Sequence, residues 1–375
     1  MLIYEYKLDG NKAQYTAIDE AIRIVQFIRN KCLRLWMDKH ASKNDLQCYC
    51  AVLAKEFPFA FSLNSQARQV AADRAWAAVS RFYDNCRNQK PGKKSYPRFQ
   101  HDNRSVEYKT TGWKLDSDGK HITFTDGCNI GRLRLIGSRD LATRPIPDIK
   151  RVRLIRRADG YYCQFAVVAE RHIEHLPSGK QIGIDVGLKA FSTDSEGVTV
   201  ENPRHYRKAE KRLKRLQRRL SKKQKKSQNR KKARKAVAKA HLKVQRQRED
   251  FARKQANALV SSHDLIAFED LQIRNMVRNR HLAKSIHDAG WGLFLAWAKY
   301  YAAAHGIPVI AIPPHSTSQN CSACGTLVKK SLSVRTHICT GCGIVLDRDH
   351  NAAMNILQKA LSPVGHTETD APLSA

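Results

Sequence analysis

The stretch that decides the fold runs from Cys321 to Ile356 and reads CSACGTLVKKSLSVRTHICTGCGIVLDRDHNAAMNI. It contains two Cys-x-x-Cys pairs, Cys321/Cys324 and Cys339/Cys342, each followed by a glycine. Two such tight turns point four thiolates at one place and supply the ligands of a closed tetrahedral zinc site. Two disulfides or four unrelated buried cysteines are the alternative, but the paired spacing favours one structural Zn²⁺. A site closed by four cysteines leaves no coordination position for chemistry.

Two carboxylates, Asp347 and Asp349, follow the second cysteine pair. They come after a short apolar run and before a segment, 352–360, whose apolar residues recur at helical spacing. A strand that delivers an acid to the start of a helix can present a metal ligand. An aspartate at a helix start can also be an N-cap that needs no metal. For Asp347 alone the cap is favoured, whereas acids at two other strand ends favour a metal role for Asp349.

The composition points to a polyanion as the partner. The chain has 375 residues, enough for two or three domains, and carries 67 Lys and Arg against 34 Asp and Glu, a formal net charge of +33. This excess favours a nucleic acid held by its phosphates. There is neither a run of about 18 apolar residues nor a signal peptide, so we expect a cytoplasmic protein without a membrane partner. Six further cysteines lack a framework spacing and are expected to be reduced: Cys32, Cys48, Cys50, Cys86, Cys128 and Cys163.

The N-terminal half is expected to be a small antiparallel β-barrel interrupted by helices. Residues 2–8 alternate like a strand, and residues 14–38 and 64–88 carry a helical stripe of apolar side chains. From residue 105 the pattern switches to a period of two, with a hairpin turn at Asp159-Gly160. The helices of 14–90 would then be an insertion into the barrel. The five later strands are expected at 105–113, 121–125, 131–136, 151–156 and 161–169.

Two basic stretches of this half leave their role open. Residues 90–99 mix lysine and arginine with Tyr96 and Phe99, which could contact phosphates and stack on bases. They could equally form a solvated loop whose aromatic rings dock in the core. Along 150–157, basic residues alternate with apolar ones. This pattern would suit a nucleic-acid-binding surface, but by itself it shows only that one face of the strand is exposed to solvent.

Residues 204–248 are overwhelmingly basic and are expected to form two helices joined as a projecting hairpin. Leu213, Leu216 and Leu220 carry the apolar stripe of the first helix. A run of charged residues is usually a solvated face. Here the positive charges are so dense that they repel one another and need counter-charge, which RNA or DNA phosphates would supply. The residues expected to contact nucleic acid are Lys222, Lys223, Lys225, Lys226, Arg230, Lys231 and Lys232.

Three carboxylates, Asp185, Glu269 and Asp349, are expected at the ends of strands. Asp185 closes the run QIGID, and Glu269 closes LIAFE. A carboxylate in an apolar strand is costly unless paired or metal-bound, although Asp-x-Gly can also be a turn. The order of strands and helices fits an α/β ribonuclease H-like fold, a mixed sheet flanked by helices. Acids gathered at one edge would repel one another unless cations lie between them, and two Mg²⁺ about 4 Å apart would allow in-line phosphodiester hydrolysis.

At this point the chain resembles TnpB, a family of transposon-associated RNA-guided endonucleases related to type V CRISPR effectors. The HDAGW segment at 287–291 is also similar to the family. The resemblance covers about 180–360, while the N-terminal half is similar only in layout and basicity. The motifs that carry it are GIDVGLK from Gly183, IAFEDL from Ile266, TSQNCSACG from Thr317 and DRDHNAAMNI from Asp347.

The resemblance implies a domain layout. A β-barrel wedge domain would comprise 1–12 and 91–176, interrupted by a helical recognition domain at 13–90. A RuvC nuclease domain would follow, and its basic helical hairpin would cover 204–258. The remaining implied boundaries are 177–314 and 344–362 for RuvC, 315–343 for the inserted zinc ribbon and 363–375 for a flexible tail.

The resemblance also implies an activity: Mg²⁺-dependent cleavage of double-stranded DNA, guided by an RNA from the transposon end, beside a short target-adjacent motif. Asp185, Glu269 and Asp349 fall on the family's catalytic positions and would hold two Mg²⁺. Asp349 is preferred to Asp347 because the matching element is D-x-N-A-A-x-N-I. The implied location is the prokaryotic cytosol or nucleoid. Two alternatives stay open, a guide-independent RuvC-like nuclease and a nuclease-inactive RNA-guided repressor, although retention of three acids favours cutting.

Overall fold

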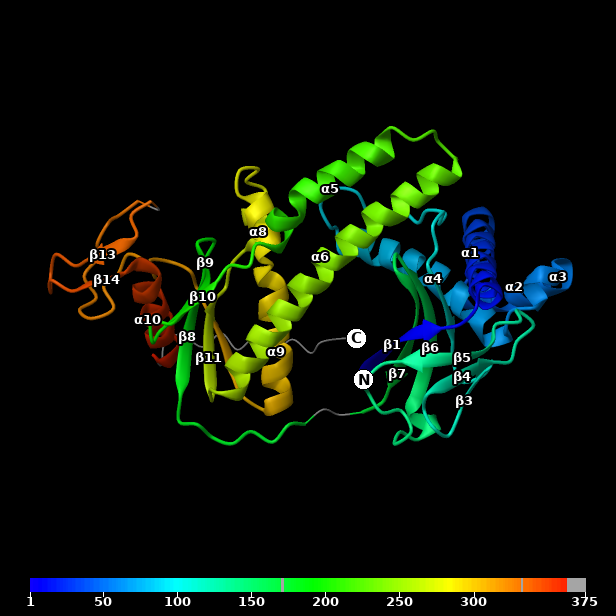
Figure 1. Cartoon of the computed structure of the whole chain (residues 1–375), viewed down its shortest axis with the longest axis horizontal. Coiled ribbons are helices and arrows are strands. Elements are labelled where there is room, and N and C mark those ends of the chain that lie inside the picture. Colours follow the sequence, from blue (N-terminus) through cyan, green and yellow to red (C-terminus); the bar gives the residue numbers. More distant parts are fainter. Residues whose placement is uncertain (170–171, 332, 363–375) are drawn as a thin grey trace. The chain divides into compact units, whose positions relative to one another are not determined.

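The computed structural model describes residues 1–169, 172–331 and 333–362 (Figure 1). The chain divides into two compact units, Met1–Glu170 and Arg171–Ala375. The tail expected at 363–375 lies outside the described residues. Within the described part, every helix is too short or too polar to cross a membrane.

The first unit is built on one antiparallel sheet with the strand order β2-β6-β7-β1-β5-β4-β3. β1 (Leu2–Asp9) lies in the middle and pairs with β7 (Gly160–Val167) on one side and β5 (Gly131–Ile136) on the other. Among the described residues the pairings end at β2 and β3, so closure of the sheet into a barrel stays a prediction. The other strands are β2 (Ser105–Tyr108), β3 (Trp113–Leu115), β4 (His121–Phe124) and β6 (Ile149–Arg157).

Two details of this sheet differ from the sequence-based expectation. The strand expected at 105–113 is two strands, β2 and β3, because the chain turns at Gly112, whose φ of +89° is a conformation that glycine adopts at little cost. The hairpin between β6 and β7 turns at Ala158 and Asp159, since Arg157 pairs directly with Gly160. Gly160 therefore opens the second strand instead of occupying the turn.

The α-helices that the structure describes in the first unit all lie between β1 and β2, and one 3-10 helix, Ile146–Asp148, precedes β6. α1 and α4 lie where the apolar stripes at 14–38 and 64–88 predict helices. The helix α2, between them, was not expected. Its sequence nevertheless carries both signals of a helix: Leu46, Cys50 and Leu53 form a buried stripe, and Ser42 and Asp45 form a capping box at its start. The helices are α1 (Lys12–Lys39), α2 (Lys43–Glu56), α3 (Pro58–Phe61) and α4 (Ser65–Arg87).

The two aromatic residues of the 90–99 stretch have different surroundings. Phe99 packs against the core of the first unit, with the Arg34 guanidinium 5.0 Å from its ring centroid. Tyr96 is 54% exposed, although its ring lies 5.2 Å from that of Phe82. The docked-loop alternative therefore holds for Phe99, whereas Tyr96 keeps an accessible ring face.

The second unit contains a five-stranded mixed sheet with the order β10-β9-β8-β11-β12. β8 (Gln181–Val186) is its central strand, antiparallel to β9 (Ala190–Asp194) and parallel to β11 (Leu265–Glu269). This is the kind of sheet that the expected ribonuclease H-like fold requires. The edge strands are β10 (Thr199–Glu201), antiparallel to β9, and β12 (Val309–Ile312), parallel to β11.

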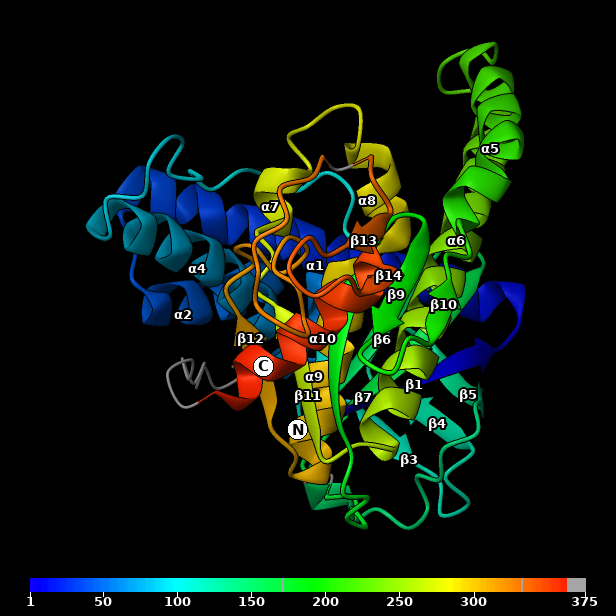
Figure 2. The ribbon, with the colours of Figure 1, turned by 90° about the vertical axis from the view of Figure 1, so that its left-hand side faces the viewer.

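Helices cover both faces of this sheet, as Figures 1 and 2 show. Ile184 and Phe268 point to the face where α6 (Gln228–Ser261) and α9 (Trp291–His305) pack. Ala267 and Ile312 point to the other face and pack with Ile356 of α10 (Arg348–Leu361). Because side chains alternate along a strand, neighbouring residues of β8 and β11 face different helices.

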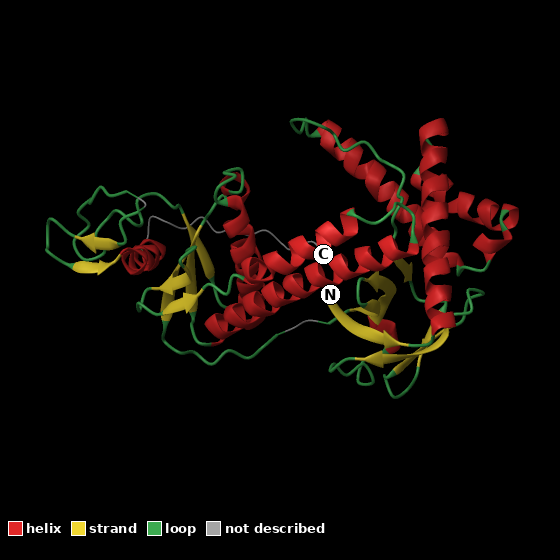
Figure 3. Ribbon diagram, turned by 45° about the horizontal axis from the view of Figure 1, so that its top comes forward, coloured by secondary structure: helices red, strands yellow, loops and turns green. Residues whose placement is uncertain are grey.

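The basic segment forms the predicted hairpin of two helices, α5 (His205–Ser221) and α6, which pack against each other (Figure 3). Farther along the chain, residues 283–305 form two helices. α8 (Ala283–Ala289) ends at Gly290, whose φ of +73° breaks the helix before α9 begins. The short helix α7 (Ile273–Met276) precedes them.

A separate two-stranded sheet belongs to the cysteine-rich segment. β13 (Thr336–Ile338) pairs antiparallel with β14 (Val345–Asp347). The strand directly before the acids of α10 is therefore part of the cysteine ribbon and not of the five-stranded sheet.

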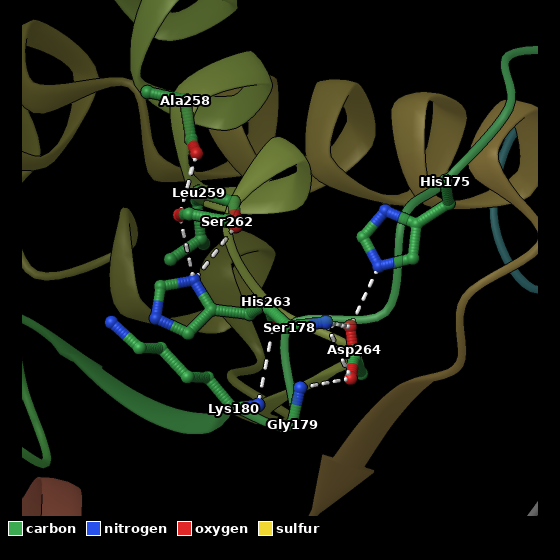
Figure 4. Close-up of polar contacts among 9 residues, drawn as sticks. All are labelled: His175, Ser178, Gly179, Lys180, Ala258, Leu259, Ser262, His263 and Asp264. Atoms are coloured by element: carbon green, nitrogen blue, oxygen red, sulfur yellow. Dashed lines mark hydrogen bonds and ion pairs between the residues drawn. The ribbon is translucent and has the colours of Figure 1, made fainter.

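Asp264, just before β11, fixes the segment that leads into β8 (Figure 4). Its carboxylate lies 2.7 Å from Nε2 of His175 and accepts hydrogen bonds from the backbone N–H groups of Ser178 and Gly179. Its own N–H donates to the carbonyl of Lys180 at 2.8 Å. The backbone donors and His175 hold the pKa of Asp264 well below its usual range. The starts of β8 and β11 are thereby tied together.

Candidate active site

Two of the predicted acids lie side by side at one edge of the sheet. Ile184 of β8 pairs with Phe268 of β11, so Asp185 and Glu269 are the next residues along two adjacent parallel strands. Since side chains alternate, both acids lie on the face that α10 covers, the face of Gly183 and Ala267. The carboxyl ends of parallel strands are where α/β sheets commonly bind ligands.

The third acid, Asp349, reaches this edge from a helix instead of a strand end. α10 lies directly on β8: a Cβ placed on Gly183 would be only 2.3 Å from the carbonyl oxygen of Ala353. Asp349 lies one helical turn before Ala353. Its Oδ2 is 3.9 Å from the position that a Cβ on Gly187 would occupy. The expectation that a strand ends in Asp349 is therefore wrong, but the structure brings it to the same edge as Asp185.

Asp347 has the structural role that its position suggested. Its Oδ1 accepts hydrogen bonds from the backbone N–H groups of Asp349, at 2.8 Å, and His350, at 3.4 Å, so it is the N-cap of α10. Asp349 instead lies 3.5 Å from Nη1 of Arg335, which belongs to the loop before β13. The geometry thus supports Asp349 over Asp347 as a metal ligand, and the assignment stays a prediction.

Burial and like charges dominate the electrostatics of the site, and nearby cations such as Arg335 offset them only in part. Burial raises the pKa of Asp185 well above its usual value, and the charges of Glu269 and Asp349 raise it further. Burial also raises the pKa of Glu269, and a hydrogen bond from the Thr317 hydroxyl opposes this shift. Within the described chain, the oxygens of the three acids do not all come within 4.8 Å of one another. The donor set of buried carboxylates fits Mg²⁺, which prefers oxygen ligands.

The four predicted cysteines meet in one cluster. The sulfur atoms of Cys321, Cys324, Cys339 and Cys342 all lie within 4.8 Å of one another, and all four are free thiols. Hydrogen bonding to Thr326 lowers the pKa of Cys324 to about 6, whereas the neighbouring sulfur atoms raise the pKa of Cys342 to about 12, so the cluster without metal shares its thiolate character unequally. Four converging sulfur ligands fit a closed structural zinc site and not a pair of disulfides.

The cysteine ribbon is fastened to the helix that carries Asp349. The buried side chain of Asn351 accepts from the N–H of Ser322 and donates to the carbonyl of Asn320, at 2.9 and 2.8 Å. Asn355, one turn later, donates to the carbonyls of Thr317 and Asn320. No role was expected from the sequence for these amides or for Thr317. Two asparagines four residues apart on a helix of small apolar residues were the available signal.

Most of the predicted nucleic-acid contacts lie at the exposed tip of the basic hairpin. Arg230 is the exception, because its Nη1 donates to the carbonyls of Leu220 and Lys223 at 3.1 and 2.9 Å. Arg230 therefore holds the turn between α5 and α6 together. The six exposed lysines are Lys222, Lys223, Lys225, Lys226, Lys231 and Lys232.

Asp288, a residue of the HDAGW segment with no role expected from the sequence, holds the base of this hairpin. Its carboxylate is 5% exposed and accepts hydrogen bonds from the backbone N–H groups of Tyr206 and Arg207, at 2.7 and 3.0 Å. The Asp288 side chain therefore caps α5 from a different helix. The residue at the N-cap position itself, Arg204, makes no side-chain capping bond. Lys284 of the same helix as Asp288 pairs with Glu210 of α5 at 2.6 Å.

Two solved structures share the fold of this chain. One is the mini-RNA-guided endonuclease CRISPR-Cas phi3, with a TM-score of 0.55 and 10% identity over 95% of this chain and 92% of that one. Another is Cas12f1 in its complex with sgRNA and target DNA, with a TM-score of 0.54 and 13% identity over 94% and 82%.

Sequence comparisons identify the particular relatives. The OrfB_IS605 transposase family matches residues 164–280, and the Cas12f1-like TNB domain matches residues 291–356. A Streptomyces pristinaespiralis protein named as an RNA-guided DNA endonuclease is 34% identical over 48% of this chain and 45% of its own length. Escherichia coli InsQ, also named as an RNA-guided DNA endonuclease, is 29% identical over 70% of this chain and 68% of its own length. A mimivirus TnpB-like protein is 28% identical over 33% of this chain and 25% of its own length. The resemblance to TnpB is confirmed.

Proposed function

We propose that this protein is an RNA-guided DNA endonuclease of transposon origin that cleaves guide-complementary DNA beside a short target-adjacent motif. The observation that carries the proposal is that Asp185, Glu269 and Asp349 lie along one edge of the sheet. The names of the sequence relatives and the fold shared with RuvC-containing effectors support it.

The three acids would bind two Mg²⁺, which would supply Lewis-acid stabilisation of the attacking and leaving oxygens of the phosphodiester. Asp185 and Glu269 are held by the strand ends, and the Thr317 hydroxyl orients Glu269. Asp349 is held by the packing of α10 on β8, and its neighbour Arg335 can offset negative charge near the site. Because burial disfavours the ionised forms of Asp185 and Glu269, and like charges further disfavour that of Asp185, a bound cation is the natural source of compensation.

The four cysteines would bind one structural Zn²⁺. Through Asn351 and Asn355, a rigid ribbon would keep the first turn of α10 in place. The zinc would therefore act on catalysis only by positioning Asp349.

The partners we propose are a guide RNA from the transposon end and a double-stranded DNA target. The net charge of +33 and the exposed lysines of the hairpin tip suit backbone contacts to either. In this assignment residues 1–12 and 91–176 form the wedge domain and residues 13–90 the helical recognition domain, so the wedge domain extends beyond the first unit, which ends at Glu170. The RuvC domain comprises 177–314 and 344–362, around a zinc ribbon at 315–343.

The test begins with the RNA that co-purifies with the protein. Its sequence would define the guide segment, and a plasmid library carrying the complementary DNA beside random flanks would then be incubated with the complex and Mg²⁺. We expect cuts only in matched DNA with one short flanking motif. Cutting without RNA would indicate a guide-independent nuclease, and guide-dependent binding without cutting would indicate a repressor; either result would contradict the proposal.

A further inference from the structure

A pocket of about 400 Å³ adjoins the acids on the antiparallel side of the sheet. Asp347 and Asp349 line it together with residues of β9, β10 and the loops at their ends. Two cations, Lys189 and Arg204, also line it, and both are exposed. Its size lies within the range of pockets that hold small ligands.

A row of side chains leads from the acid site into this pocket. Asp185 of β8 pairs with Thr193 of β9, and Thr193 pairs with Thr199 of β10. Directly paired residues of neighbouring antiparallel strands point to the same face, so the three side chains form one row. Because Thr193 and Thr199 line the pocket, the pocket continues the acid site across the sheet.

The chain holds Arg204 in a conformation that arginine rarely adopts. Its φ is +48° and its ψ is +47°, and such left-handed residues are costly and concentrate at functional sites. Asn202 sustains the conformation, since its Oδ1 accepts from the N–H of Arg204 at 3.2 Å while its Nδ2 donates to the carbonyl of Leu188 at 3.1 Å. The same asparagine therefore connects the loop before Lys189 with the turn that presents Arg204.

The two cations have no acidic partner in the described part of the chain, although Glu201, Asp347 and Asp349 line the same pocket. A DNA strand is negatively charged, and so are the three active-site acids that it must approach. Besides the metal ions proposed above, cationic side chains beside the site would reduce this repulsion and bind the strand by its phosphates. Lysine and arginine are the side chains that bind phosphate, and the threonine hydroxyls add neutral donors.

We propose that this pocket seats a backbone phosphate of the cut DNA strand, within about two nucleotides of the cleaved bond, with Lys189 and Arg204 as substrate-positioning residues. The inference rests on the proposed function and extends it to a binding subsite. The pocket lies next to Asp349 and in line with Asp185, so a phosphate there would fix the register of the strand against the acids.

The first test combines variants with uncharged phosphates. Lys189→Gln removes one charge, and Arg204→Asn removes the other while keeping a residue that tolerates the left-handed conformation. Lys299→Gln, at an exposed position of α9, is the matched control. Each protein, with its co-purified RNA, would cleave matched DNA in which one phosphate near the cut is a neutral methylphosphonate, scanned position by position.

We expect one methylphosphonate to slow the wild type and Lys299→Gln by about tenfold, the size of a typical charge coupling. The same substitution should slow Lys189→Gln or Arg204→Asn by no more than about twofold, because the partner charge is already gone. Equal penalties in all four proteins at every position would overturn the proposal. A loss of stability alone would leave the methylphosphonate penalty unchanged.

A second measurement does not depend on cutting and so separates this inference from the proposed function. DNA with a thiol tethered to the same phosphate would be offered to complexes of Lys189→Cys and Lys299→Cys, and the linked peptide would be mapped by mass spectrometry. A disulfide that forms at position 189 and not at 299 supports the pocket even if no DNA is cleaved. Equal yields at the two positions contradict it.

Discussion

Gly183 of β8 and Ala353 of α10 are in backbone contact, since a Cβ on Gly183 would lie 2.3 Å from the Ala353 carbonyl oxygen and 2.7 Å from the N–H nitrogen of Leu357. No side chain can occupy that space without displacing the helix. The contact sets the height of α10 above the sheet, and thereby the position of Asp349 relative to Asp185. A glycine two residues before the first acid is thus part of the site's geometry.

The first prediction follows from this contact. Gly183→Ala should lower the free energy of unfolding by about 1–3 kcal/mol through overpacking, and a shift of Asp349 by about 1 Å should slow cutting by about 100-fold. Thermal unfolding and cleavage rates would measure both. Gly292→Ala on α9 is the control, because its Cβ would meet only Ile273 at 3.6 Å and should leave both values nearly unchanged.

The second prediction separates the two acids at the start of α10. Asp349→Ala should abolish cutting, because it removes a metal ligand that the site cannot replace. Asp347→Ala should reduce cutting less than Asp349→Ala does. It should lower the free energy of unfolding by about 1 kcal/mol, the usual effect of losing an N-cap. One cleavage assay on both variants is sufficient. An inactive Asp347→Ala beside an active Asp349→Ala would show that the third ligand is misassigned.

The third prediction concerns the metal of the ribbon. Elemental analysis should find about one zinc per chain, and the double variant Cys321→Ser with Cys324→Ser should lose it, since four ligands are needed to close the site. Because Asn351 and Asn355 tie the ribbon to α10, the loss should also lower the melting temperature and slow cutting. A fully folded wild-type protein without zinc would contradict the assignment.

Sequence patterns were sufficient for the parts of the site that are local. The runs that end in Asp185 and Glu269 are apolar over several residues, so each acid could be placed at the end of a buried strand. The cysteine pairs could be assigned because both thiolates of each pair are three residues apart. The helix α2 was equally local and could have been found from Ser42 and Asp45.

The parts that the sequence did not show depend on distant contacts. Asp288 caps α5 across 82 residues of sequence, and Thr317 bonds to Glu269 across 48. β14 resembles a strand of the main sheet in sequence, but its partner is β13 of the ribbon. Tertiary packing decides which strand or backbone group such a residue contacts. A local sequence pattern does not contain this information.

The fourth prediction concerns the hairpin tip. Replacing Lys222, Lys223, Lys225 and Lys226 with alanine should weaken RNA retention and reduce the slope of log affinity against log salt by about 3, if all four contact phosphates. The matched control replaces the same lysines with arginine, which keeps the charge and should keep retention. If the alanine variant retains RNA as well as the wild type at every salt concentration, the tip is only a solvated surface.

The most direct test of the central claim is cleavage of guide-matched DNA, in Mg²⁺, by the wild-type complex and by Asp185→Ala and Glu269→Ala. We expect the wild type to cut, both variants to be inactive, and target binding to survive in both, because base pairing and phosphate contacts supply it. Cutting at the wild-type rate by both variants would contradict the assignment of this edge of the sheet as the nuclease site.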